Sequence, residues 1–91
     1  MTAIAKEDYV KYIKPFISGI YDVLQNNKLN QTESILVVDS FLHIINAEYN
    51  MQVLLKELKK ITPLQKKVLE NHCLIDSFNM AQTFLNSEQS E

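Results

Sequence analysis

The stretch Asn30–Lys60 decides the fold, and it reads NQTESILVVDSFLHIINAEYNMQVLLKELKK. Its first half is so rich in apolar residues that no continuous polar face remains between Ile35 and Ile45. Asn30 and Glu33 have the spacing of a capping box, in which each side chain satisfies a free backbone N–H at the start of a helix. The stretch therefore predicts one helix of about 30 residues. The alternative is a break near residues 46–50, where two Asn residues are weak helix formers.

Two apolar stripes run along this predicted helix when its residues are placed on a helical wheel. The first, called here the heptad stripe, alternates spacings of four and three residues, which is typical of a coiled coil. It consists of Val37, Phe41, Ile44, Met51, Leu55 and Leu58, with Glu48 at the position between Ile44 and Met51. The other, called here the second stripe, consists of Ile35, Val38, Leu42, Ile45 and Tyr49. A helix with two such stripes needs neighbours on both of its sides.

Glu48 would place a carboxylate among the apolar neighbours of the heptad stripe. A polar group at one such position often fixes the register or the oligomeric state of packed helices. The sequence therefore predicts that Glu48→Leu stabilises the protein and loosens its choice of oligomeric state. The alternative is that the stripe opens at Glu48 and lets the carboxylate reach water.

Two more helices are predicted, one on each side of this stretch. The first runs from about Thr2 to Gln25 and is kinked or split at Pro15, because proline lacks a backbone N–H and crowds the preceding turn. A polar loop over residues 26–29 follows it. The last helix begins at Thr62–Gln65, where Thr is the expected N-cap and Pro the first helical residue. It runs to about Leu85.

The predicted fold class is all-α: an antiparallel bundle of three long helices, in three to four segments because of Pro15. The 91 residues form one domain, 1–91, in which residues 86–91 are expected to be a frayed acidic tail. One Gly and two Pro provide few turns, which favours long helices.

Composition and charge exclude several classes of function. The chain has nine Lys and no Arg, with a net charge of −2, which argues against a dedicated nucleic-acid binder. No apolar run approaches the roughly 18 residues that span a membrane. Residues 1–7 lack the pattern of a signal peptide, and the single Cys73 allows no internal disulfide. A cytoplasmic location is therefore expected.

The apolar stripes also predict that the protein is an oligomer. Two of the three helices are apolar on both sides, whereas a three-helix bundle needs one buried stripe per helix. The heptad stripe is therefore the expected interface with a second chain. Its predicted interface residues are Val37, Phe41, Ile44, Glu48, Met51, Leu55 and Leu58. The alternative is that the kinked first helix covers the remaining faces within one chain.

No arrangement of residues indicates catalysis, a cofactor or a metal. Asp39 and His43 are four residues apart on one helix, and His72 and Asp76 repeat this spacing, but no further carboxylate has the spacing of a bundle metal site. Cys73 is expected to be a buried structural thiol. One Gly excludes a glycine-rich phosphate loop. The sequence predicts a protein that is not an enzyme.

A cluster of lysines marks the turn before the last helix. It consists of Lys56, Lys59, Lys60, Lys66 and Lys67, with Glu57 as the only acid among them. Such a patch suits an acidic partner, a phosphate-bearing small molecule or anionic lipid headgroups. A plain solvated helix end is the alternative.

These observations favour a small helical module that acts by binding another protein as an inhibitor, adaptor or immunity-type protein, of the kind that phages and mobile elements encode. An oligomer that binds an anionic molecule such as a nucleotide through the Lys56–Lys67 patch is the first alternative. In size, helical layout and low glycine content, the chain is also loosely similar to small bacteriocin immunity proteins. That resemblance implies a cytosolic helical bundle and is the second alternative. These proteins are usually more basic than a chain of net charge −2.

Overall fold

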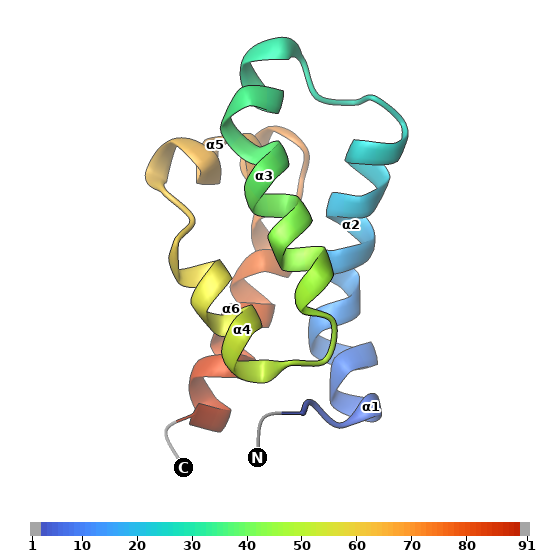
Figure 1. Cartoon of the computed structure of the whole chain (residues 1–91), viewed down its shortest axis with the longest axis vertical. Coiled ribbons are helices and arrows are strands. Elements are labelled where there is room, and N and C mark those ends of the chain that lie inside the picture. Colours follow the sequence, from blue (N-terminus) through green and yellow to red (C-terminus); the bar gives the residue numbers. More distant parts are fainter. Residues whose placement is uncertain (1–2, 90–91) are drawn as a thin grey trace.

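Helices make up most of the chain in the computed structural model, which describes residues 3–89 (Figure 1). In chain order the elements are α1 (Lys6–Asp8), the π-helical turn η1 (Tyr9–Ile13), α2 (Lys14–Gln25), α3 (Gln31–Ala47), α4 (Met51–Lys59), α5 (Pro63–Asn71) and α6 (Ile75–Gln89). The all-α prediction is confirmed. The prediction of three long helices is wrong, because each of the two later helices is split in two.

The first helical segment follows the prediction most closely. Pro15 lies in the first turn of α2, and the wider π-helical turn η1 comes directly before it. Proline has no N–H to donate to an earlier carbonyl, so a change in helical pitch at this point removes the conflict. Gly19 lies in the middle of α2, and a Cβ at this position would collide with Cδ2 of Leu74. The absence of a side chain at Gly19 thus lets α2 approach the residue that precedes α6.

The predicted single helix over Asn30–Lys60 is wrong, because the chain turns between α3 and α4. Glu48 has φ 52° and ψ −119°, the angles of the first central residue of a type II′ turn, which glycine usually occupies. The backbone N–H of Asn50 donates to the Ala47 carbonyl at 3.0 Å. The Asn50 side chain accepts from the Val53 N–H at 3.1 Å and so caps α4. The alternative of a break among these Asn residues is therefore confirmed.

A second break separates α5 from α6. The predicted start of the last helix is confirmed as the start of α5, where Thr62 and Gln65 form a capping box. Cys73 then has φ 58°. The N–H of Leu74 donates to the Leu69 carbonyl at 2.7 Å, and that of Cys73 donates to Glu70 at 3.1 Å. These two bonds are a Schellman motif, which ends a helix with a left-handed residue that is usually glycine.

The C-terminal end of the chain is more helical than predicted. Instead of a frayed tail from residue 86, α6 continues to Gln89. Residues 90 and 91 of the predicted tail lie outside the described residues.

The two breaks let five helices of nine or more residues surround one core. Figure 1 shows α2 and α3 side by side, with α4 below α5 on the other flank and α6 behind them. The helix α6 packs against η1, α2, α4 and α5, while α3 packs against α2, α4 and α5. The molecule measures 39 × 23 × 20 Å. The N-terminal segment is tied to the α3–α4 turn, since the Ile4 N–H donates to the Tyr49 carbonyl at 2.8 Å.

The heptad stripe lies inside this core, which corrects its assignment as an interface with a second chain. Val37, Phe41 and Ile44 are 0% exposed within the single chain. Of the other predicted interface residues, Leu55 and Leu58 are buried and Met51 is half-buried, all on α4. Glu48 is exposed in the turn and belongs to no helical stripe. Because α4 folds back beside α3, the chain covers its own heptad stripe.

The geometry at Glu48 leads to a prediction opposite to that from the sequence. Glu48→Gly is expected to raise the free energy of unfolding by about 1 kcal/mol, because glycine adopts this backbone region without strain. Glu48→Leu retains the strain and gains no buried site, so it is expected to give no stabilisation. Urea unfolding of both variants tests this. A stabilisation by Leu equal to that by Gly would show that side-chain burial, rather than backbone strain, governs this position.

Candidate interaction surfaces

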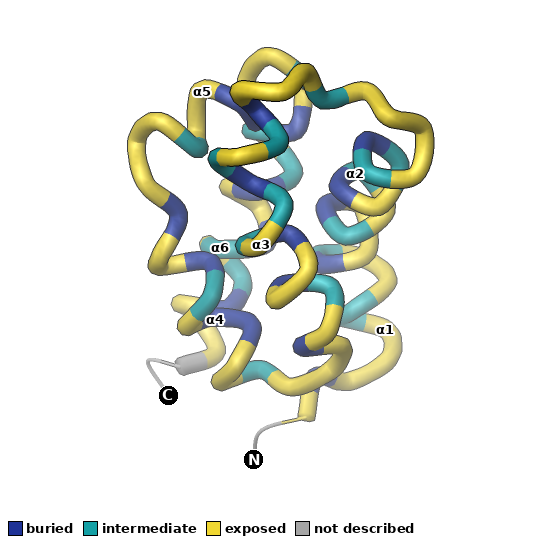
Figure 2. The backbone as a smooth tube through the Cα atoms, turned by 45° about the horizontal axis from the view of Figure 1, so that its top comes forward, coloured by how far each residue is buried: buried dark blue, intermediate teal, exposed yellow. Residues whose placement is uncertain are grey.

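The second stripe of α3 is an apolar surface that the described residues leave partly uncovered. Ile35 is 78% exposed and Leu42 is 46% exposed, while Val38 and Ile45 are half-buried. Figure 2 shows exposed positions recurring along α3 between its buried ones. The helix is thus apolar on two sides, as predicted, but the side that lacks a neighbour is the second stripe.

A shallow groove of about 290 Å³ lies where this stripe meets α2. Its walls come from two helices, with Tyr21, Leu24 and Gln25 on α2 facing Leu42 and Ile45 on α3. Tyr21 is 53% exposed and supplies a large apolar ring with a polar tip. An apolar groove between two antiparallel helices is a common binding site for a further helix.

Only one of the four tyrosines is placed as an anchor for this groove. Tyr9 and Tyr49 pack on each other with ring centroids 4.2 Å apart, beside the α3–α4 turn. Tyr12 stacks on Phe84 of α6 at 4.7 Å. These three tyrosines therefore hold elements of the chain together, and Tyr21 alone lines the groove.

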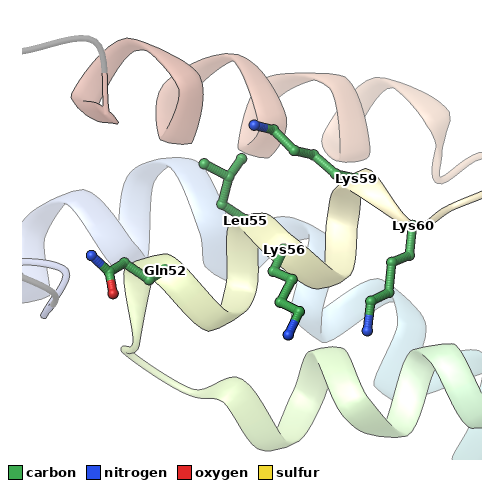
Figure 3. Close-up of a pocket in the computed structure, with 5 residues that line it drawn as sticks. All are labelled: Gln52, Leu55, Lys56, Lys59 and Lys60. Atoms are coloured by element: carbon green, nitrogen blue, oxygen red, sulfur yellow. The ribbon is translucent and has the colours of Figure 1, made fainter.

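A second depression, of about 460 Å³, lies over the exposed face of α4 (Figure 3). It is lined by Gln52, Leu55, Lys56, Lys59 and Lys60. Figure 3 shows Lys59 and Leu55 extending towards α6, with Lys56 and Lys60 on the other side of α4. All five residues belong to α4 or its C-cap, so the depression has no wall from a second element.

The structure thus divides the predicted lysine patch. Lys56, Lys59 and Lys60 share the depression, whereas Lys66 and Lys67 lie on α5 and do not line it. The ammonium group of Lys66 instead lies 5.9 Å from the centre of the Phe78 ring, which is within the range of a cation–π contact.

A buried polar cluster joins α3 to the end of α5, and the sequence indicated only part of it. Glu33 completes the predicted capping box with Asn30, whose N–H donates to Oε1 at 3.1 Å. The same carboxylate accepts from His72 Nε2 at 3.0 Å and from Asn71 Nδ2 at 3.2 Å. Glu33 is buried, and its hydrogen bonds hold the start of α3 against the end of α5, so we assign the cluster a structural role. The capping signal in the sequence marked Glu33 but not its distant partners.

This cluster makes stability depend on pH in a defined direction. Hydrogen bonds from His72, from the Asn30 backbone and from Asn71 hold the pKa of Glu33 below its ordinary value of 4.5. A carboxylate with a lowered folded-state pKa contributes its full stability above the unfolded-state pKa and loses it as pH falls through the folded-state pKa. The stability difference between wild type and Glu33→Gln is therefore expected to shrink as the pH falls below about 4.5. Thermal unfolding between about pH 5 and pH 3 measures it, and a difference that stays constant or grows over this range would contradict this assignment.

The candidate metal ligands are not brought together. His43 lies 3.4 Å from Asp39 on the exposed surface of α3, while His72 faces Glu33 rather than Asp76, because the helix is broken between them. Among the described residues, no group of three or more His, Cys, Asp and Glu could hold a metal ion. Cys73 is exposed in the α5–α6 turn, which corrects its prediction as a buried thiol.

In the part of the chain that the structure describes, no helix has the length and apolar character to cross a membrane. Comparison with family models, with curated proteins and with solved structures finds no match to this chain.

Proposed function

We propose that the protein is a non-catalytic helical module that binds another protein through the α2–α3 groove and acts as an oligomer. The observation that supports this proposal is the uncovered second stripe, on which Ile35 and Leu42 are exposed and Leu42 lines the groove together with Tyr21 of α2. These are large apolar side chains on one surface, and a partner helix could bury them together. An inhibitor, an adaptor and a bacteriocin-immunity-type protein would each act through a surface of this kind.

The size of the surface sets the expected affinity. Full burial of one such side chain stabilises a complex by about 1.5–3 kcal/mol. Association itself costs about 4–15 kcal/mol, so three anchors give weak binding unless the partner adds further contacts.

A second copy of the chain is the first partner to test. In a two-fold symmetric dimer, the second stripe of one protomer would face the same stripe of the other, so both copies would cover their exposed apolar residues at once. The heptad stripe takes no part in this arrangement, because its residues are already buried.

Leu42→Glu is expected to abolish self-association, because it places a charge in the middle of the groove. The wild type should show a mass that rises with concentration in light scattering, while the variant stays at the monomer mass. Val10→Glu is the matched control, since Val10 is also exposed but lies on η1, away from the groove. Its mass should follow the wild type.

A wild type that stays monomeric at every concentration would exclude the second copy as the partner. Wild-type and Leu42→Glu baits would then be compared in a pull-down from lysate. Capture of the same proteins at equal yield by both baits would contradict a role for the groove.

A binder of an anionic small molecule, such as a nucleotide, is the second candidate, and the lysine-lined depression on α4 supports it. Thermal unfolding with nucleotides at low and high salt separates the two: a ligand raises the unfolding midpoint, and salt diminishes that gain. This candidate is weaker than the first, because all residues that line the depression come from α4 or its C-cap. Small-molecule sites usually enclose most of their ligand, which one helix cannot do.

A further inference from the structure

The exposed face of α4 carries positive charge that the described residues neutralise only at Lys60. Lys60 pairs with Glu57 at 3.3 Å. Lys56 and Lys59 form no ion pair with any described residue. On a protein of net charge −2, this face is thus a local region of the opposite sign.

The positions of these lysines match the spacing of a helix surface. Lys56, Lys59 and Lys60 stand at positions i, i+3 and i+4, so they fall within one broad exposed face of α4, with Lys59 at the edge nearest α6 and Lys56 and Lys60 further from it (Figure 3). Gln52 continues this face one turn earlier and adds an uncharged hydrogen-bond donor. Val53 is exposed at the edge of the same face and offers an apolar contact. Lys56 and Lys59 lie in the last turn of α4, where a positive charge interacts favourably with the helix dipole. This interaction does not occupy the hydrogen-bond donors of their ammonium groups.

The open shape of this face favours a protein surface over a small anion as its ligand. A small anion would need walls from several elements, and every lining residue of this depression comes from α4 and its C-cap. A broad, open face with spaced ammonium groups is instead complementary to a protein surface that carries carboxylates at a similar spacing. We propose that the exposed face of α4 (Gln52, Val53, Lys56, Lys59 and Lys60) is a second docking surface, which binds an acidic segment of a partner protein. This surface is separate from the α2–α3 groove, so either proposal can fail without the other.

The test uses the full chain and a fluorescein-labelled peptide of about ten glutamates, titrated by fluorescence anisotropy at low and at physiological salt. Binding is expected at low salt and should weaken as salt screens the charges. The triple variant Lys56→Gln, Lys59→Gln, Lys60→Gln should bind about tenfold more weakly, because exposed ion pairs each contribute little but act together here.

Two matched variants separate local charge from net charge. The control Lys6→Gln, Lys11→Gln, Lys14→Gln removes the same charge from exposed lysines of the N-terminal helical segment and should bind like the wild type. Replacement of Lys56, Lys59 and Lys60 by Arg keeps the charge and should also retain binding. Circular dichroism confirms that each variant is folded.

Three results would overturn the proposal. The first is no binding of the glutamate peptide at low salt, and the second is equal weakening by both triple Gln variants. The third is binding of sodium triphosphate or of phosphatidylserine vesicles in place of the peptide, which would assign the face to free phosphates or to lipid headgroups.

Discussion

Phe41→Ala is expected to lower the free energy of unfolding by about 3–5 kcal/mol, the range for removing a large aromatic side chain from a packed core. Phe41 lies on the heptad stripe of α3 and is 0% exposed within the single chain. Ile35→Ala on the second stripe of the same helix is expected to change this free energy by less than about 0.5 kcal/mol, because Ile35 is 78% exposed. Urea unfolding of both variants at a concentration below self-association measures the difference.

The pair of variants compares the two apolar sides of one helix. If the heptad stripe were covered by a second chain, Phe41→Ala would act mainly on assembly and would have little effect on the diluted protein. Similar losses for Phe41→Ala and Ile35→Ala in diluted protein would contradict the burial that the structure assigns to the two stripes.

Glu33→Ala is expected to have the second largest effect, a loss of about 2–4 kcal/mol at pH 7. The substitution removes the acceptor for His72, Asn71 and the N–H of Asn30 together, and it leaves these donors without that partner at a largely buried site. Unfolding in urea at pH 7 measures the loss.

Glu70→Ala is the matched control for Glu33→Ala. Glu70 is an exposed carboxylate on α5, close to the same junction, and removing it changes the net charge by the same amount. Its substitution should change the free energy of unfolding by less than about 0.5 kcal/mol. An equal loss in the two variants would indicate a general effect of charge rather than the hydrogen bonds of the cluster.

The starts of α3 and α5 could be predicted from the sequence, because their signals are local. Asn30 with Glu33 and Thr62 with Gln65 each form the capping box that their spacing indicates. The ends of α2 at Gln25 and of α4 at Lys59 also agree with the predicted boundaries, whereas the ends of α3 and α5 could not be predicted, because no glycine marks them. Asn27, Glu48 and Cys73 all have positive φ, a backbone region that glycine usually occupies.

The helix α2 ends with the same pattern of backbone hydrogen bonds as α5. The Lys28 N–H donates to the Val23 carbonyl at 3.0 Å and the Asn27 N–H donates to Leu24, as in the Schellman motif at Cys73. A left-handed residue other than glycine is strained, so tertiary contacts must hold it in place. At the α3–α4 turn, the pairing of Ile4 with Tyr49 provides such contacts, and no local pattern could reveal them.

The stripe of α3 that stays exposed is not the one that the sequence favours as an interface. Two apolar stripes on one helix indicate more apolar surface than a single bundle face needs, and Ile35 and Leu42 are the exposed part of it. The regular heptad spacing favoured the stripe with Phe41 as the interface, yet regular spacing is equally typical of a core face. The turn at Glu48 determines which stripe is buried, because it folds α4 back beside α3 and leaves Leu42 and Ile35 exposed.

One chain buries its own heptad stripe, apart from the half-buried Met51, and leaves Ile35 and Leu42 of the second stripe exposed. The most direct test is the thermal unfolding midpoint of Leu42→Glu over a hundredfold dilution series, because any stabilising self-association makes this midpoint depend on concentration. We predict a cooperative transition whose midpoint does not change with dilution. A midpoint that falls on dilution, with loss of helix at the lowest concentrations, would show that the heptad stripe requires a second chain and would contradict this account.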